Sequence, residues 1–179
     1  MKSIKRIAII GNAGSGKSVL AQKLHQILHL PVYHLDKYFW KSNWTHPDPD
    51  EYKIIHDKLC NQEEWIMDGM NLRLLEYRIQ RADIIIFLDI PRYLCFWRIF
   101  KRTIKYYGKE TPSSAKDCRE GFLNIKFIKF LKWVWDFKKR YPPKIIELLN
   151  AYSNSKSIYI LKLQKEIDQF IDKLNEKMK

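Results

Sequence analysis

The sequence lacks long hydrophobic runs. No apolar stretch approaches the roughly 18 residues that a membrane-spanning helix needs, so the sequence predicts no transmembrane helix. The apolar run near the N-terminus, Ile7 to Ile10, is also too short for the core of a signal peptide. We therefore expect a cytoplasmic protein.

Patterns of metal-binding and disulfide-forming residues are also missing. The three cysteines, Cys60, Cys95 and Cys118, lie far apart and include no C-x-x-C pair. Their odd number favours reduced structural thiols over a disulfide framework. The five histidines form no H-E-x-x-H pattern, so we expect no transition metal held by the protein itself.

Acidic residues are few relative to basic ones. The chain has 33 Lys plus Arg against 20 Asp plus Glu, a formal net charge of +13 at pH 7. This balance indicates an anionic partner, which charge alone leaves open among nucleic acid, an anionic membrane surface and a phosphorylated small molecule. The 179 residues are 46% hydrophobic, enough for a core and too much for a disordered chain. We expect residues 1–179 to form one domain.

Short apolar runs alternate with longer segments of helical periodicity. This alternation predicts an α/β fold in which a five-stranded parallel sheet is covered by helices on both faces, a three-layer sandwich. In such sheets ligands bind beyond the carboxyl ends of the strands. The expected strands are 6–10, 32–35, 65–67, 84–89 and 157–163, and the expected helices are 17–29, 52–62, 72–81, a long one from 91, 122–141 and 164–178.

A glycine-rich loop follows the first expected strand and matches G-x-x-x-x-G-K-[ST] in every position. Glycines let the backbone N–H groups surround a phosphate, and the next helix points its positive end at the same anion. Lys17 would bridge terminal phosphates, and the Ser18 hydroxyl would bind Mg²⁺. The residues we expect to hold the nucleotide are Gly11, Asn12, Ala13, Gly14, Ser15, Gly16, Lys17 and Ser18.

Aspartates follow three further strands. Asp36 could accept a proton from the substrate or hold Mg²⁺ through water, or it could be a helix cap or loop carboxylate. Asp68 could anchor Mg²⁺ through water, or its Asp-Gly pair could form a turn. We interpret Asp89, which comes before Pro91, as a turn or cap residue.

Basic residues concentrate in residues 92–144, which contain 15 Lys plus Arg and 4 Asp plus Glu and therefore carry a net charge of +11. Arg98 and Arg102 would share a helix face, and Arg119 follows a polar stretch, 108–117, that is typical of a mobile loop. On a closing lid these arginines would clamp polyphosphate and stabilise the moving phosphoryl group. Alternatively they belong to solvated surfaces.

Two aromatic stretches allow two interpretations each. The aromatics of 38–52 could stack on a substrate ring or form a satellite core. The lysines and aromatics of 122–141 are typical of single-stranded nucleic-acid binding. Helical spacing instead favours a helix with an apolar stripe on one face and a lysine-rich face toward solvent. The residues at this spacing are Phe127, Leu131, Val134, Trp135 and Lys138.

The loop at 11–18, His34-Leu35-Asp36 and Trp65-Ile66-Met67-Asp68-Gly69 together resemble the adenylate-kinase-like P-loop kinases. The similarity is greatest to the topology modulation (FlaR-like) proteins. The resemblance implies a P-loop NTPase sandwich with a small helical lid, and ATP as donor with Mg²⁺. It also implies that Arg98 and Arg102 contact adenine and phosphate, and that Arg119 is a returning lid arginine.

One departure bears on the acceptor. Adenylate kinases follow Asp-Gly with an aromatic-Pro-Arg run, where this chain has Met70-Asn71-Leu72-Arg73, so AMP is not implied as acceptor. The segment His34-Leu35-Asp36 is closer to uridine-kinase-like enzymes, whose aspartate activates a hydroxyl.

Three functions fit these features. The first is a kinase that moves the γ-phosphate of ATP to a small-molecule acceptor, with Lys17, Asp36, Arg98, Arg102 and Arg119 as catalytic residues and Ser18 and Asp68 at the metal. The second is a nucleotide-dependent regulatory protein that binds DNA or RNA through residues 92–144, and the third is a simple NTPase. We expect no membrane partner, while the acceptor and the oligomeric state stay open.

Overall fold

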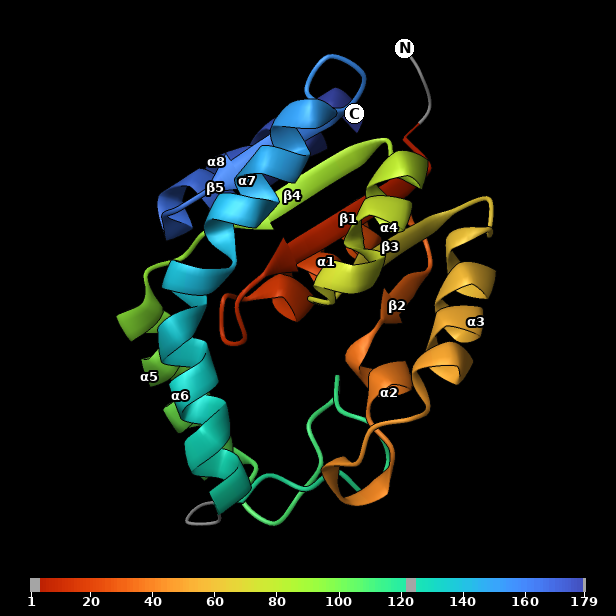
Figure 1. The fold of residues 1–179 in the computed structure, drawn as a ribbon. Helices are drawn as coiled ribbons and strands as arrows, with labels where there is room; N and C mark the ends of the chain where they lie inside the picture. Colours follow the sequence, from red (N-terminus) through yellow and green to blue (C-terminus); the bar gives the residue numbers. More distant parts are fainter. Residues whose placement is uncertain (1–3, 122–124, 179) are drawn as a thin grey trace.

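A computed structural model of the chain describes residues 4–121 and 125–178. Within these residues five parallel strands form one sheet in the order β2-β3-β1-β4-β5 (Figure 1). The strands are β1 (Arg6–Gly11), β2 (Val32–His34), β3 (Trp65–Asp68), β4 (Ile84–Leu88) and β5 (Ser157–Leu161).

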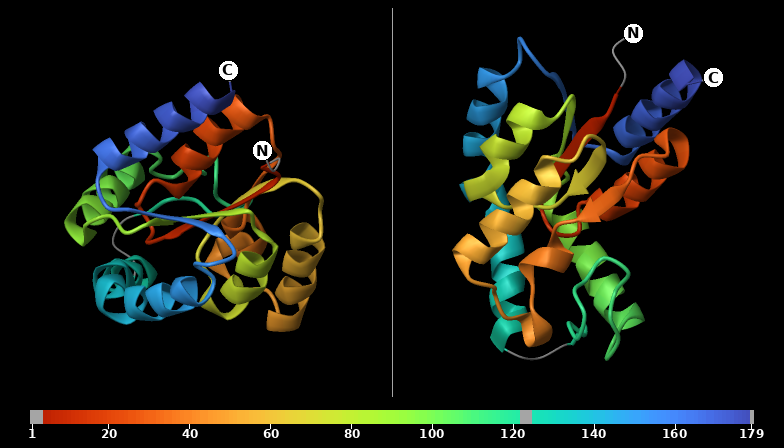
Figure 2. Two further views of the ribbon diagram at one scale, coloured as in Figure 1. Left: turned by 90° about the horizontal axis from the view of Figure 1, so that it is seen from above. Right: turned by 90° about the vertical axis from the view of Figure 1, so that its right-hand side faces the viewer.

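Helices cover both faces of the sheet (Figure 2). One face packs against α1, α8 and the inner side of α5, and the other packs against α3, α4 and α7. The helices are α1 (Lys17–Leu28), α2 (Asp36–Phe39), α3 (Pro49–Cys60), α4 (Leu75–Arg81), α5 (Arg92–Lys105), α6 (Ile125–Arg140), α7 (Pro142–Ala151) and α8 (Gln164–Met178), with 3₁₀ turns η1 (Ser42–Trp44) and η2 (Leu72–Leu74).

Burial explains the sequence patterns of the strands. Every residue of β4, and every residue of β1 after Arg6, is buried, because both strands lie inside the sheet and have helices on each face. Such strands are continuous apolar runs rather than alternating ones. β5 lies at the edge and keeps several of its residues exposed.

The expected α/β sandwich is confirmed, with two helices that the sequence analysis did not anticipate. One is the single-turn helix α2, and the other is α7, which starts at Pro142, where proline suits a first helical turn. α3 begins at Pro49, earlier than expected, because Asp48 caps it by accepting from the N–H groups of Asp50 and Glu51. Residues 122–124 of the expected helix 122–141 lie outside the described residues.

One expectation for α6 is wrong. We placed Trp135 in the buried stripe, but it is 44% exposed, whereas Val134 and Phe137 are the buried residues of this helix. Residues 134 and 137 share a face, while residue 135 is rotated by about 100° from residue 134. Trp135 therefore turns toward α5, where the Arg92 guanidinium lies 4.2 Å from its ring centroid.

The end of β4 is joined to α6 by a charged pair. Asp89 is buried, its backbone N–H donates to the Leu161 carbonyl at 2.9 Å, and its carboxylate pairs with Lys138. The N-cap of α5 is Pro91, so Asp89 is not the cap that we considered. Its contact with Lys138 instead attaches α6 to the sheet beside the glycine loop.

The segment between α5 and α6 lies where the sequence predicts a lid, and we call it the lid segment. In its described part, 106–121, the chain forms turns and two isolated bridges, Tyr107 with Glu120 and Glu110 with Arg119. It rests on the segment after β2, because the Cys118 thiol lies 3.3 Å from the Lys41 carbonyl and the Trp44 indole donates to the Arg119 carbonyl at 3.1 Å.

Candidate active site

The glycine loop joins the end of β1 to the start of α1. Gly14 has a φ of 75°, and a Cβ on it would lie 2.4 Å from the Cys95 carbonyl oxygen, so no other residue fits without displacing α5. The Asn12 side chain donates to the Val134 carbonyl at 2.9 Å. Helices α5 and α6 therefore hold the loop from two sides, which fixes its curvature before any ligand binds.

Lys17 is the charged group at the centre of the loop. It is buried, and its ammonium donates to the Asn12 carbonyl at 2.8 Å. Burial lowers the pKa of Lys17, while the nearby Asp36 and Asp68 carboxylates oppose this shift. The desolvated ammonium therefore lies within electrostatic reach of both aspartates.

Ser18 and Asp68 come together from α1 and β3. The Ser18 hydroxyl donates to one Asp68 carboxylate oxygen at 2.6 Å, and His34 Nδ1 lies 2.5 Å from the other. His34 and Asp68 are also partners in the parallel pairing of β2 with β3. Both carboxylate oxygens are engaged, so Asp68 is held in one orientation, which argues against the simple Asp-Gly turn.

In the sequence, His34 stands out only as part of the motif His34-Leu35-Asp36. Its ring now lies between Asp68 and Gln22, whose amide nitrogen is 3.2 Å from Nε2. The missing signal was strand pairing, because the two residues are 34 positions apart and no local pattern relates them.

Asp36 is the first residue of α2, next to the end of β2. The cap of α2 is Leu35, so Asp36 lies inside the first turn rather than capping it. The surrounding protein partly desolvates the Asp36 carboxyl and so raises its pKa, and Lys17 acts in the opposite direction. The side chain is still exposed, so water screens part of this effect.

Two of the three arginines lie beside the loop. Arg98 donates to the Ser15 carbonyl at 3.1 Å and to the Gln164 amide oxygen at 3.0 Å, which links the loop to α8. Arg102 forms an ion pair with Glu120 at 2.8 Å and acts electrostatically on Lys17 and Asp36. The Glu120 carboxylate also accepts from Thr103 at 3.1 Å, so the lid segment holds Arg102 in place.

Arg119 lies apart from this group. It lines an open pocket of about 390 Å³ between the lid and η1, together with Ser42, Trp44 and Asp117. No hydrogen bond or ion pair joins the Arg119 side chain to the glycine loop within the described residues.

A second pocket, of about 260 Å³, lies beside the glycine loop. Apolar side chains of α1 and α8 and the polar groups of Arg98 and Gln164 line it, a combination that suits a flat ring with a polar edge. Nothing in the sequence singles out Gln164, because this residue begins the last helix, far from every motif. The lining residues are Ser15, Gly16, Val19, Leu20, Lys23, Arg98, Gln164 and Ile167.

The aromatic stretch after β2 packs mainly on itself. The Phe39 and Tyr52 rings lie 5.1 Å apart, and the Trp40 and His46 rings lie 4.3 Å apart. These contacts favour the satellite-core interpretation. Trp44 is the member that also lines the pocket beside Arg119.

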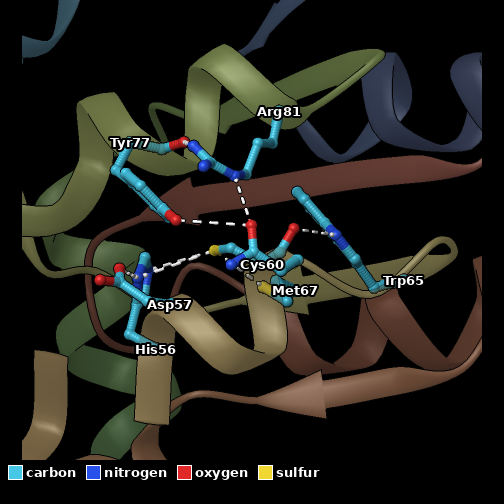
Figure 3. Close-up of polar contacts among 8 residues, drawn as sticks. His56, Asp57, Cys60, Trp65, Met67, Tyr77 and Arg81 are labelled. Atoms are coloured by element: carbon cyan, nitrogen blue, oxygen red, sulfur yellow. Dashed lines mark hydrogen bonds and ion pairs between the residues drawn. The ribbon is translucent and has the colours of Figure 1, made fainter. Parts of the chain in front are cut away.

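A different polar cluster lies between α3 and α4 (Figure 3). The Cys60 thiol lies 3.7 Å from the His56 ring and 3.8 Å from the Met67 sulfur. The Trp65 indole donates to the Cys60 carbonyl at 3.3 Å. Burial raises the pKa of Cys60 to about 11 and lowers the pKa of His56 to about 4, so both side chains are neutral at pH 7.

Arg78 is fully buried behind this cluster. One of its nitrogens donates to the Gly69 carbonyl at 3.0 Å, while Nε and Nη1 have no hydrogen-bond partner. Burial lowers the pKa of Arg78, and Tyr52, Cys60, Asp68 and Asp36 act in the opposite direction, in that order. Nothing in the local sequence pattern around Arg78 predicts that its side chain is buried.

Two classes of feature are missing from the part of the chain that the structure describes. No helix there is long and apolar enough to cross a membrane. Nor do those residues contain a group of three or more His, Cys, Asp or Glu that could hold a metal ion. Cys60, Cys95 and Cys118 are buried and form no disulfide.

No model of a known protein family matches the chain. The chain is 31% identical over 133 residues to the uncharacterized protein YqaC of Bacillus subtilis, a match that covers 72% of this chain and 70% of that protein. Its fold is similar to shikimate kinase from Acinetobacter baumannii in complex with shikimate, with a TM-score of 0.58, 11% identity, and coverage of 99% of this chain and 94% of the other.

A gluconokinase from Sinorhizobium meliloti gives a TM-score of 0.54 at 12% identity, over 99% of this chain and 93% of the other. These structures support the P-loop kinase fold that the resemblance implied. They do not confirm the narrower relation to the topology modulation proteins.

Proposed function

The chain belongs to the family of the uncharacterized protein YqaC and has a P-loop kinase fold, and from this premise we propose that it is an ATP-dependent phosphotransferase. The acceptor is a small molecule that carries a hydroxyl group. The observation that carries the proposal is the meeting of Lys17, Ser18, Asp36 and Asp68 at the carboxyl ends of the strands, beside a loop shaped for phosphate.

The donor phosphates lie in the glycine loop. Backbone N–H groups and the positive end of α1 bind the phosphate oxygens, and Lys17 leaves the Asn12 carbonyl to contact them. The buried Lys17 ammonium then contacts a negative phosphate directly, whereas Asp36 and Asp68 act on it only electrostatically. Because the ammonium is already desolvated, the phosphate does not have to displace water from it.

The pocket beside the loop takes the base of the nucleotide. Val19, Leu20 and Ile167 supply apolar contacts for a flat ring, and Arg98 and Gln164 supply polar groups at its edge. Arg98 thus joins the base pocket to the phosphate loop through the Ser15 carbonyl.

Ser18 and Asp68 would hold Mg²⁺ together with the phosphates. Their oxygens lie 2.6 Å apart, and oxygen ligands are what Mg²⁺ requires. Since the described residues offer no larger metal-binding group, substrate phosphates and water would complete the coordination. When bound, the ion would neutralise charge on the β- and γ-phosphates.

Asp36 removes the proton from the acceptor hydroxyl. As the acceptor oxygen forms its bond to the γ-phosphorus, the bond between that phosphorus and the bridging oxygen breaks, and ADP leaves. A raised pKa suits this role, because the carboxylate then keeps the proton better. Arg102 stabilises charge on the moving group, whereas Arg98 acts at the edge of the base pocket, and Arg119 joins Arg102 when the lid closes.

Two alternative functions predict different experimental outcomes. A simple NTPase would release phosphate to water, and a nucleotide-dependent regulatory protein would bind DNA or RNA through residues 92–144, which carry a net charge of +11. The discriminating experiment incubates the full chain with ATP and Mg²⁺ in the presence of nucleosides, nucleoside monophosphates or small hydroxy compounds. ADP release and the mass of the phosphorylated acceptor are measured.

We expect ADP release to depend on one acceptor class, with one phosphorylated acceptor formed per ADP. The matched control is Lys17→Ala, checked for folding by circular dichroism. ADP release that is equal with and without every acceptor, or that persists in Lys17→Ala, would contradict the proposal.

A further inference from the structure

Helix α5 is apolar on two sides. Cys95, Ile99 and Thr103 are buried against the core on its inner side. A second stripe, Tyr93, Trp97, Phe100 and Ile104, follows the spacing of one helix face and is between 40% and 63% exposed. A surface helix normally has one apolar stripe, so the second one requires an explanation.

Helix α6 also carries exposed apolar side chains. Ile128 is 61% exposed and Trp135 is 44% exposed, and the Trp135 ring lies 6.2 Å from the ring of Phe96 on α5. The two helices contact each other on one flank of the molecule (Figure 1), and their ends nearest the segment 106–121 lie apart in the right-hand view of Figure 2. We name the outer side of this pair the α5–α6 outer face, formed by Tyr93, Trp97, Phe100, Ile104, Ile128 and Trp135.

Charges of one sign surround this face. Helix α5 contains five Lys or Arg residues and no acidic residue, and α6 contains six Lys or Arg residues and one acid, Asp136, which pairs with Arg140. Of these basic residues, Arg102 pairs with Glu120 and Lys138 pairs with Asp89. Among the described residues, the exposed Lys129, Lys132 and Lys139 make no ion pair. The face therefore combines exposed apolar side chains with uncompensated positive charge.

We propose that the α5–α6 outer face binds the surface of an anionic lipid membrane. Apolar and aromatic side chains on one side of a helix, with Lys and Arg beside them, are the composition of elements that lie in a membrane interface without spanning it. The apolar side chains enter the boundary of headgroups and acyl chains, and the lysines contact anionic headgroups. This proposal differs from our expectation that no membrane takes part, and it is independent of the phosphotransferase proposal.

Two other occupants fit less well. Single-stranded nucleic acid stacks its bases on free aromatic faces. Here the Lys101 ammonium lies 5.0 Å from the Trp97 centroid, Arg92 lies 4.2 Å from that of Trp135, and the two isoleucines have no π-face. A second copy of the chain would bring the same positive charges against each other, which is unfavourable.

The test is cosedimentation of the full chain with vesicles of phosphatidylcholine alone, or of phosphatidylcholine mixed with phosphatidylglycerol. We expect binding to the anionic vesicles only, weakened but not abolished by salt. The double variant Trp97→Ser/Ile104→Ser should bind the anionic vesicles at least about tenfold more weakly than the parent. The matched control, Ile54→Ser/Ile146→Ser, removes two exposed isoleucines elsewhere and should bind normally.

The same assay tests the role of the lysines and the two other occupants. Lys132→Glu/Lys139→Glu should lower anionic-vesicle binding, while acceptor-dependent ADP release stays unchanged in every variant. Equal binding to both vesicle types, or normal binding by Trp97→Ser/Ile104→Ser, would overturn the proposal. So would a single-stranded oligonucleotide that displaces the chain from vesicles, or self-association in sedimentation velocity that this double variant abolishes.

Discussion

Two groups of polar side chains lie close together near the end of β3 and differ in how their charges are balanced. The first, the site group, is Lys17, Ser18, His34, Asp36 and Asp68, in which opposite charges and hydrogen-bond partners face each other. The second, the buried group, is Tyr52, His56, Cys60 and Arg78, of which all but Arg78 are neutral at pH 7.

The difference separates two uses of polar residues. The site group lies at the carboxyl ends of strands, where a ligand can complete it. The buried group packs between α3 and α4 among core side chains. We therefore expect substitutions in the site group to reduce activity and to leave stability unchanged. Substitutions in the buried group should reduce stability and leave the activity of the folded fraction unchanged.

The largest expected effect is that of Lys17→Ala. Phosphoryl transfer should fall by at least about 10³-fold, because the variant loses the charge that stabilises the transferring phosphate. The thermal midpoint should stay near that of the parent, since the lost ammonium bonds only the Asn12 carbonyl. Lys53→Ala, on exposed α3, is the control. A Lys17→Ala variant that is fully active would break the comparison.

The next effect is that of Asp36→Asn, measured as acceptor-dependent turnover against pH. Turnover should fall by about 10²- to 10⁴-fold with ATP binding kept, because only the base is lost. In the parent, activity should decline as pH falls through the raised pKa of Asp36, at a higher pH than an ordinary aspartate would give. If the decline in activity at low pH persists unchanged in Asp36→Asn, that decline reports the protonation of another group.

Arg78 tests the buried group. Arg78→Ala should lower the free energy of unfolding by about 3 kcal/mol, through a cavity and the loss of the bond to the Gly69 carbonyl. Arg78→Met should cost much less, since it keeps the volume and removes a buried charge with two unpartnered nitrogens. Denaturant unfolding measures both. If Arg78→Met is stable and inactive, Arg78 belongs to the site group.

His56 should make stability depend on pH. Burial, reinforced by Arg78 and opposed by Asp57, lowers its folded-state pKa to about 4 from 6.5. Between these two pKa values the unfolded chain binds a proton that the folded chain does not. The free energy of unfolding therefore decreases as the pH is lowered from about 6.5 to about 4, by up to about 3 kcal/mol. His56→Leu should remove this contribution. Parallel pH profiles for both proteins would contradict it.

The smallest effect is that of Arg98→Met, at the edge of the site group. The KM for ATP should rise about three- to tenfold through loss of the contacts with Ser15 and Gln164, with little change in kcat. Steady-state kinetics measure both constants, with Arg92→Met as a control on the same helix. A large fall in kcat would instead place Arg98 on the transferring phosphate.

Much of the fold could be predicted from local pattern. The buried runs of β1 and β4 and the amphipathic α8 follow from composition and spacing. The glycine loop is fixed by a motif whose chemistry is local. The motif did not reveal His34 or Gln164, because each acquires its partner through strand or helix packing rather than through sequence spacing.

Sequence alone thus determined most of the strands and helices and the loop that we expect to bind phosphate, because periodicity and loop motifs are properties of neighbouring residues. Tertiary structure alone decided that Arg78 is buried, that Trp135 is exposed and that Asp68 contacts both Ser18 and His34. Periodicity indicates which residues share a face of their own helix or strand. Only the packed arrangement of elements decides whether another element covers that face.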